Sequence, residues 1–175
     1  MSYVTLARCL VANAGRRLLR FRFLLRRLSA KKSVRFQIAR HTFLVSVLAL
    51  RIYLVEDNAI IRENLAAALA ELANTTMCGS ADGEKIAAAW LKANPDEWDL
   101  AIVDVFLKEG NGIGVVAAGK TRRADQGLVV LTNYASSGVR EQCLKLGADA
   151  VFDKSHDIDN LVDFCLQQSA SQKKS

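Results

Sequence analysis

The hydrophobic positions of residues 51–175 alternate between two patterns. Short apolar runs that are rich in β-branched residues have the length and composition of buried strands. These runs lie near 51–55, 75–79, 99–104, 128–132 and 149–152. Between them, apolar residues recur at the three-to-four-residue spacing of a helix. Because strands and helices alternate along the chain, we predict an α/β fold with a five-stranded parallel sheet covered on both faces by helices.

Start and stop signals for helices fall between the predicted strands. We predict helices near 59–72, 83–93, 112–124, 137–146 and 157–168. Asn58 can cap the first of these helices, and Pro95, the single proline of the chain, ends the second. Gly147 is a good terminator for the fourth helix. Five strand-helix units follow from these signals.

Polar residues close four of the five predicted strands. They are Glu56, Asp57, Asp104, Thr132 and Lys154. Open parallel sheets place their chemistry at the carboxyl ends of the strands, so we expect these residues to gather at one edge. Clustered carboxylates repel one another, and a bound Mg²⁺, which prefers oxygen ligands, usually neutralises this repulsion. Asp104 can then act as a nucleophile that carries a phosphoryl group, while Lys154 and Thr132 contact the phosphate oxygens.

The residues around these strand ends form an ordered set of motifs. The motifs are Val55-Glu56-Asp57-Asn58, Asp104 through Gly112, Leu131-Thr132-Asn133, Gly147-Ala148-Asp149 and Phe152-Asp153-Lys154. With them, residues 51–168 resemble the receiver domain of bacterial two-component response regulators. The resemblance implies a doubly wound sheet of flavodoxin-like order. It also implies a cytoplasmic signalling module that is not an enzyme, apart from at most weak self-dephosphorylation.

The resemblance also implies a role for each strand-end residue. Asp104 is expected to be phosphorylated by a histidine kinase or a histidine phosphotransfer protein. Asp57, Asp104 and the backbone carbonyl of Phe106 are expected to bind Mg²⁺, with Glu56 assisting. The resemblance assigns the phosphate contacts to Thr132 and Lys154. The partner of the phosphorylated state is expected to be a downstream protein or a second copy of the chain.

Several positions depart from the pattern of the family. Ser155 follows Lys154 where many receivers have proline, and Val151 occupies the position of a switching aromatic residue. Phe106 and Tyr134 lie two residues after Asp104 and Thr132, where side chains overlook the phosphate. We expect these two rings to hinder an attacking water and to prolong the phosphoryl state. The alternative is that both rings simply cover apolar surface.

The net charge of +6 is distributed unevenly along the chain. Residues 1–50 carry eleven Arg or Lys and no acid, whereas residues 51–175 carry thirteen Lys or Arg against eighteen Asp or Glu, a net charge of −5. We therefore divide the chain into a basic extension (1–50), a receiver domain (51–168) and a polar tail (169–175). The pattern of the extension predicts a basic amphipathic helix that binds an anionic membrane or nucleic acid. The alternative is that the extension is translated sequence upstream of the true start and is not native.

Two other classes of function compete with the receiver. A haloacid dehalogenase-like phosphatase also uses an Asp nucleophile with Mg²⁺, but it needs a second Asp where this chain has Phe106, and a cap domain for which there is no room. A nucleic-acid-binding regulator would depend wholly on residues 1–50. After Lys154 one helix remains, so we expect no output domain. The four cysteines show no metal-binding spacing, and we expect them to be reduced.

Overall fold

The computed structural model describes residues 49–172. The chain divides into two compact units, Met1–Ala49 and Leu50–Ser175. The predictions for the basic extension concern residues that lie almost wholly outside the described part, as does the end of the predicted tail. No helix of the described part is long and apolar enough to cross a membrane.

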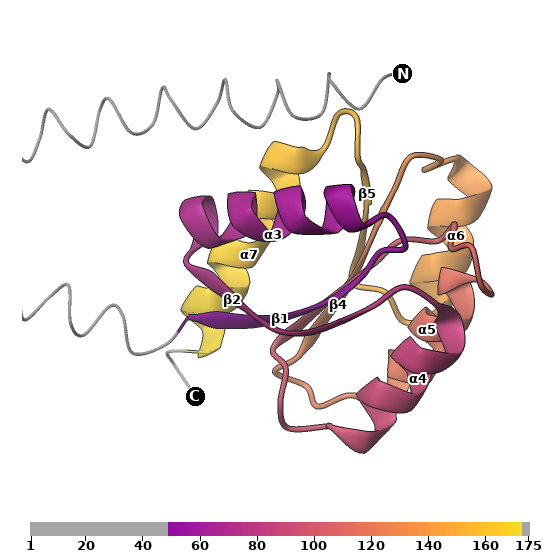
Figure 1. Ribbon diagram of the computed structural model, residues 1–175, viewed down its shortest axis with the longest axis horizontal. Coiled ribbons are helices and arrows are strands. Elements are labelled where there is room, and N and C mark those ends of the chain that lie inside the picture. Colours follow the sequence, from indigo (N-terminus) through magenta and orange to yellow (C-terminus); the bar gives the residue numbers. More distant parts are fainter. Residues whose placement is uncertain (1–48, 173–175) are drawn as a thin grey trace, which may run out of the picture. The chain divides into compact units, whose positions relative to one another are not determined.

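Five parallel strands form one sheet, as the alternating pattern predicts (Figure 1). The strands are β1 (Leu50–Val55), β2 (Thr75–Ala81), β3 (Leu100–Val103), β4 (Gly127–Thr132) and β5 (Ala150–Asp153). Their order across the sheet is β2-β1-β3-β4-β5. The chain thus moves outward from β1 to one side and then, through β3, to the other side. This order confirms the predicted doubly wound, flavodoxin-like sheet.

Helices cover both faces of the sheet. They are α3 (Ala59–Ala73), α4 (Glu84–Ala93), α5 (Gly112–Ala118), α6 (Ser137–Leu146) and α7 (Ile158–Gln172). Helices α3 and α7 lie on one face, and α4, α5 and α6 lie on the other (Figure 1). The predicted cap is confirmed, because the Asn58 side chain accepts hydrogen bonds from the backbone amides of Ile60 and Ile61. Gly147 ends α6 with a left-handed φ of 111°.

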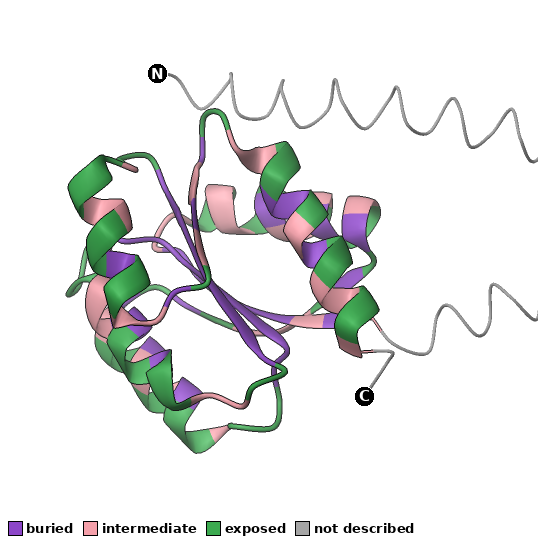
Figure 2. Cartoon of the chain, turned by 180° about the vertical axis from the view of Figure 1, so that it is seen from behind, coloured by how far each residue is buried: buried purple, intermediate pink, exposed green. Residues whose placement is uncertain are grey.

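The hydrophobic core has two parts, one on each face of the sheet. Alternate residues of β1 belong to different parts: Ile52 packs with α3 and α7, and Tyr53 packs with the opposite helices. Every residue of β3 and β4 is buried. Figure 2 shows the buried residues along the strands and on the inner sides of the helices. Because helices cover both faces, the carboxyl ends of the strands are the place where this parallel sheet can present polar groups for chemistry.

Two predicted helix ends are wrong. The third helix does not reach 124; α5 ends at Ala118 and a single 3₁₀ turn, η1 (Gly119–Thr121), follows. A Cβ atom at Gly119 would lie 2.3 Å from the Leu128 side chain. Arg122 has an extended backbone, and its guanidinium donates a hydrogen bond to the Gly119 carbonyl. The helical pattern thus ends where the chain packs closely against β4 and becomes extended at Arg122. The last helix continues to Gln172, beyond the predicted end at 168.

Candidate functional site

Four polar side chains lie buried at the carboxyl ends of neighbouring strands. Glu56 and Asp104 directly follow β1 and β3, Thr132 ends β4, and Lys154 directly follows β5. Their exposed fractions are 2%, 7%, 0% and 2%. Because β3 lies between β1 and β4 in the sheet, Asp104 stands at the centre of this group. The structure thus brings together four of the five predicted residues.

Lys154 connects two of the carboxylates. Its Nζ lies 2.5 Å from Oε2 of Glu56 and 2.5 Å from Oδ2 of Asp104. Burial disfavours the ammonium, but Asp104 and Glu56 outweigh burial and raise the pKa of Lys154. Burial has the opposite effect on an acid and raises the pKa of Glu56, although Lys154 opposes the shift. An ammonium between two buried carboxylates leaves one negative charge without compensation.

Asp57 directly follows Glu56 but does not share the Lys154 ammonium. Its side chain is partly open to solvent, and its nearest cation is Lys108, whose Nζ lies 3.5 Å from Oδ2 of Asp57. The Lys108 side chain is 76% exposed, so this ion pair is weak and easily displaced. Lys108 belongs to the loop that follows β3. The local sequence pattern does not predict that Lys108 pairs with Asp57.

The oxygen donors at this edge suit a divalent cation. Across residues 49–172, no three acidic, histidine or cysteine side chains converge as a ready-made metal site. The available donors are nonetheless only carboxylate and carbonyl oxygens, which hard cations such as Mg²⁺ prefer. Glu56, Asp57 and Asp104 carry three negative charges against two on Lys154 and Lys108. The residues therefore fit Mg²⁺ in chemistry and in charge.

Backbone contacts connect the strand ends to the loops that follow. Oδ1 of Asp104 accepts a hydrogen bond from the Phe106 amide at 3.2 Å, and Oγ1 of Thr132 accepts one from the Tyr134 amide at 3.4 Å. The Lys154 amide donates to the Thr132 carbonyl at 3.0 Å. A change at Asp104 or Thr132 therefore acts directly on the following loop.

Two exposed aromatic rings lie at the entrance to this edge. Phe106 and Tyr134 are 53% and 67% exposed, and their ring centroids are 5.0 Å apart in an edge-to-face arrangement. They come from the loops after β3 and β4, so one ring stands beyond Asp104 and the other beyond Thr132. The two predicted modulating residues thus contact each other.

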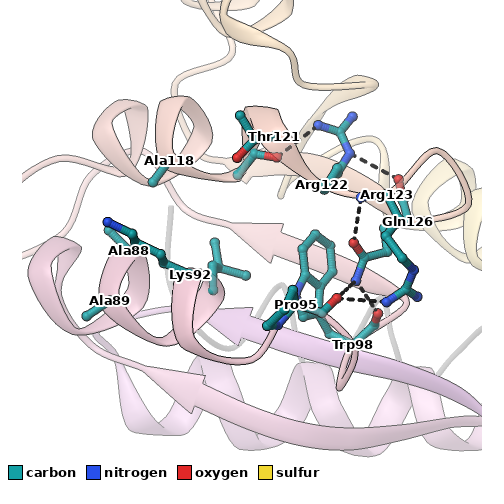
Figure 3. Close-up of a pocket in the computed structure, with 12 residues that line it drawn as sticks. Ala88, Ala89, Lys92, Pro95, Trp98, Ala118, Thr121, Arg122, Arg123 and Gln126 are labelled. Atoms are coloured by element: carbon teal, nitrogen blue, oxygen red, sulfur yellow. Dashed lines mark hydrogen bonds between the residues drawn. The ribbon is translucent and has the colours of Figure 1, made fainter.

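A separate cavity of about 450 Å³ lies at the opposite ends of the strands (Figure 3). Its walls come from the end of α4, from η1 and from the segments that lead into β3 and β4. The Gln126 side chain donates to the carbonyls of Pro95 and Trp98 beside it. No predicted site residue contributes to this cavity, so it does not belong to the strand-end site.

Comparisons with known proteins identify the family. The family model described as response regulator receiver domain matches residues 52–165, and the chain belongs to this family. The photosynthetic apparatus regulatory protein RegA of Cereibacter sphaeroides is 31% identical over 120 residues, which cover 67% of this chain and 62% of RegA. The chain spans less than two thirds of the curated relatives that it matches. The described domain is therefore a signalling module of two-component systems.

Solved structures agree on the fold. The receiver domain of the putative response regulator NarL from Mycobacterium tuberculosis has a TM-score of 0.60 at 21% identity and covers 70% of this chain and 97% of its own. A response regulator from Burkholderia pseudomallei, solved with a phosphorylated aspartic acid, a calcium ion and citrate, has a TM-score of 0.55 at 22% identity. That match covers 71% of each chain. These likenesses establish the receiver fold.

Proposed function

We propose that this protein accepts a phosphoryl group on Asp104 and so switches a protein-interaction surface. The observation that carries the proposal is the buried Lys154 ammonium, 2.5 Å from both Glu56 and Asp104 at the carboxyl edge of the sheet. A carboxylate can act as the nucleophile in phosphoryl transfer. The ammonium fixed beside it can bind the oxygens of the incoming phosphoryl group. The donor is a histidine kinase or a histidine phosphotransfer protein.

The transfer forms one bond and breaks one. An oxygen of the Asp104 carboxylate attacks phosphorus, the phosphorus–nitrogen bond of phosphohistidine breaks, and the imidazole leaves with the electron pair and takes up a proton. Asp57, Asp104 and the Phe106 carbonyl would hold Mg²⁺, with Glu56 assisting. When bound, Mg²⁺ supplies charge neutralisation at the phosphoryl oxygens. Lys154 moves from the Asp104 carboxylate to a phosphoryl oxygen.

Thr132 connects this chemistry to the surface. Its hydroxyl is fully buried and contacts the Tyr134 amide, so movement of the hydroxyl toward the phosphoryl group shifts the loop between β4 and α6. The surface of α6, β5 and α7 then changes for a downstream protein or for a second copy of the chain. Val151 is buried on β5, so a rotating aromatic ring at that position is not the signal. We place this activity in the cytoplasm.

Intact mass spectrometry tests the phosphoacceptor. Incubation with acetyl phosphate and Mg²⁺ should add one phosphoryl group to the wild-type chain and none to Asp104→Asn. Asp82→Asn is the matched control, since Asp82 is an exposed aspartate near the same edge of the sheet. It should be phosphorylated like the wild type. Persistent phosphorylation of Asp104→Asn would remove Asp104 from its role.

Phe106 and Tyr134 extend the proposal to the lifetime of the phosphoryl group. The two rings contact each other edge to face, two residues after Asp104 and Thr132, and exclusion of water from Asp104 by this pair would remove the nucleophile for hydrolysis. Phe106→Asn combined with Tyr134→Glu should therefore lose phosphate about tenfold faster, equivalent to about 1.4 kcal/mol in the barrier. The decay of the phosphorylated mass after removal of acetyl phosphate measures this rate. Equal lifetimes would mean that the rings only cover apolar surface.

A further inference from the structure

Glu84, the first residue of α4, fastens the loop between β3 and α5. Its Oε2 accepts a hydrogen bond from the Asn111 amide at 2.6 Å, and its own amide donates to the Glu109 carbonyl at 3.0 Å. The neighbouring Gly83 pairs with Glu109 as an isolated parallel bridge. Glu84 and Asn111 are 27 residues apart in the sequence. Residue patterns near either segment do not predict this contact.

The loop is shaped around the Glu84 carboxylate. A Cβ atom at Gly110 would lie 2.5 Å from Oε2 of Glu84, and one at Gly114 would lie 2.0 Å from Oε1. Gly110 also has a left-handed φ of 81°, which side chains other than that of glycine rarely adopt. Glycine at both positions therefore leaves the space that the carboxylate occupies.

The same loop begins at the phosphoacceptor. The Asp104 carboxylate accepts the Phe106 amide at 3.2 Å, and the Gly112 amide donates to the Val105 carbonyl at 2.9 Å. The segment from Phe106 to Asn111 is thus held at its start by Asp104 and at its end by Glu84. The Phe106 carbonyl, a ligand of Mg²⁺ in the proposed function, lies on this segment.

We infer that Glu84 is a positioning residue that holds the loop after Asp104 in the conformation that binds Mg²⁺. This inference rests on the proposed function, because it assigns the Phe106 carbonyl to the metal. Glu84 acts through the backbone of the loop and contacts no reacting atom. A hydrogen bond from an amide to a carboxylate is among the stronger kinds, so one such contact is enough to restrain a short loop.

Three variants separate the hydrogen bond from the charge. Glu84→Ala removes both, and Glu84→Gln keeps a side-chain oxygen that can accept the Asn111 amide. Asp82→Asn removes a negative charge two residues away, where no ion pair or hydrogen bond is lost. In Glu84→Ala, amide exchange at Asn111 should accelerate, and the Mg²⁺ concentration at half saturation should rise, each by about threefold to tenfold. Glu84→Gln should stay closer to the wild type, and Asp82→Asn should match it.

The readouts are hydrogen exchange by nuclear magnetic resonance and calorimetric titration with Mg²⁺ alone, without a phosphodonor. Unchanged exchange and unchanged Mg²⁺ binding in Glu84→Ala would overturn the inference. Equal weakening in Glu84→Gln and Asp82→Asn would assign the effect to charge and would also overturn it. If instead the wild-type chain gains no phosphoryl group from acetyl phosphate, the proposed function fails, whatever the Glu84 variants do.

Discussion

Lys154 is a buried cation that depends on two buried carboxylates for its charge compensation. It is 2% exposed and lies between two carboxylates that are themselves buried. Removing one partner of a buried ion pair leaves an unsolvated charge, whereas the complete cluster satisfies its members. We therefore expect the loss of any one member of this charge cluster to destabilise the fold.

Replacing Lys154 tests this cost. Lys154→Met should lower the free energy of unfolding by about 3 kcal/mol at pH 8, because Glu56 and Asp104 lose their shared cation. Burial raises the pKa of Glu56 above its usual value, and such a group contributes stability at low pH that is lost as the pH rises. The deficit of the variant should therefore shrink as the pH falls from 8 to 5, because protonation of Glu56 removes one of the two uncompensated charges. Urea unfolding at both pH values measures it, and a deficit independent of pH would contradict the interpretation.

Tyr53 offers a second prediction about a single residue. Its ring stacks on Trp90 at 4.0 Å, and its hydroxyl is buried without a hydrogen-bond partner in the described part of the chain. Tyr53→Phe should raise the free energy of unfolding by about 1 kcal/mol at pH 7, since an unsatisfied hydroxyl is costly. Denaturant unfolding of the variant and the wild type at the same pH measures the difference.

The same substitution changes the response to alkaline pH. Burial raises the pKa of Tyr53 to about 12, so the folded wild type keeps a proton that the unfolded chain releases above about pH 10. Stability of the wild type should therefore fall between pH 10 and 12, by at most about 1.4 kcal/mol per pH unit for this one group. Tyr53→Phe should fall less steeply. Parallel slopes would show that the phenol does not titrate in this way.

At the level of elements, backbone packing determines where the loops after the strands run. The loop after β3 turns back so closely that a Cβ atom at Gly112 would lie 1.9 Å from the Asp104 carbonyl oxygen. Arg140 of α6 has a comparable role beside β4 and β5. Its guanidinium donates to the carbonyls of Ala135 and Val151 and contacts Asp157 at 3.3 Å. One side chain thus joins α6 to the loop after β4, to β5 and to the start of α7.

Two glycine substitutions test how strongly packing constrains these elements. Gly112→Ala should lower the free energy of unfolding by about 3 kcal/mol, because the clash is with backbone atoms that cannot move aside. Gly138→Ala is the control, since Gly138 lies in α6 with nothing within 4 Å of the added Cβ. It should raise stability by about 0.5–1 kcal/mol, because alanine favours a helix. Thermal unfolding of both variants measures the two changes in stability. Similar changes in Gly112→Ala and Gly138→Ala would contradict the prediction.

At the scale of the whole molecule, charge separates two parts of the chain. Residues 1–50 carry eleven cations and no acid, whereas residues 51–175 have a net charge of −5. The compact unit Leu50–Ser175 includes the whole of the family match. We therefore assign the proposed phosphoryl acceptance to that unit, and we expect any contact with nucleic acid or an anionic membrane to come from the basic extension.

A chain that begins at Ala49 tests this division. It should gain a phosphoryl group from acetyl phosphate like the full chain, because every proposed site residue lies after Glu56 or is Glu56. Any retention of the full chain on DNA or anionic vesicles should weaken as salt rises and should be absent from the short chain. Intact mass and binding at two salt concentrations provide the measurements. Loss of phosphorylation on truncation would show that the extension takes part in the site.

Local periodicity and strand order are enough to predict a large part of residues 49–172. Short β-branched runs and helical stripes can be identified within a few residues, so the five strands, the helices α3 to α7 and the two-sided core follow from the pattern. The gathering of Glu56, Asp104, Thr132 and Lys154 follows as well, because parallel strands share one carboxyl edge.

Only the tertiary structure decided the contacts between residues far apart in the chain. It places Lys154 on Glu56 and Asp104, leaves Asp57 to Lys108, and fastens the loop after β3 with Glu84. It also shows that α5 ends at Ala118, next to Gly119, which packs closely against Leu128 of β4. Such outcomes depend on distances between separate elements. The spacing of residues within one segment carries no information about these distances, because they are set by how the helices and strands pack against one another.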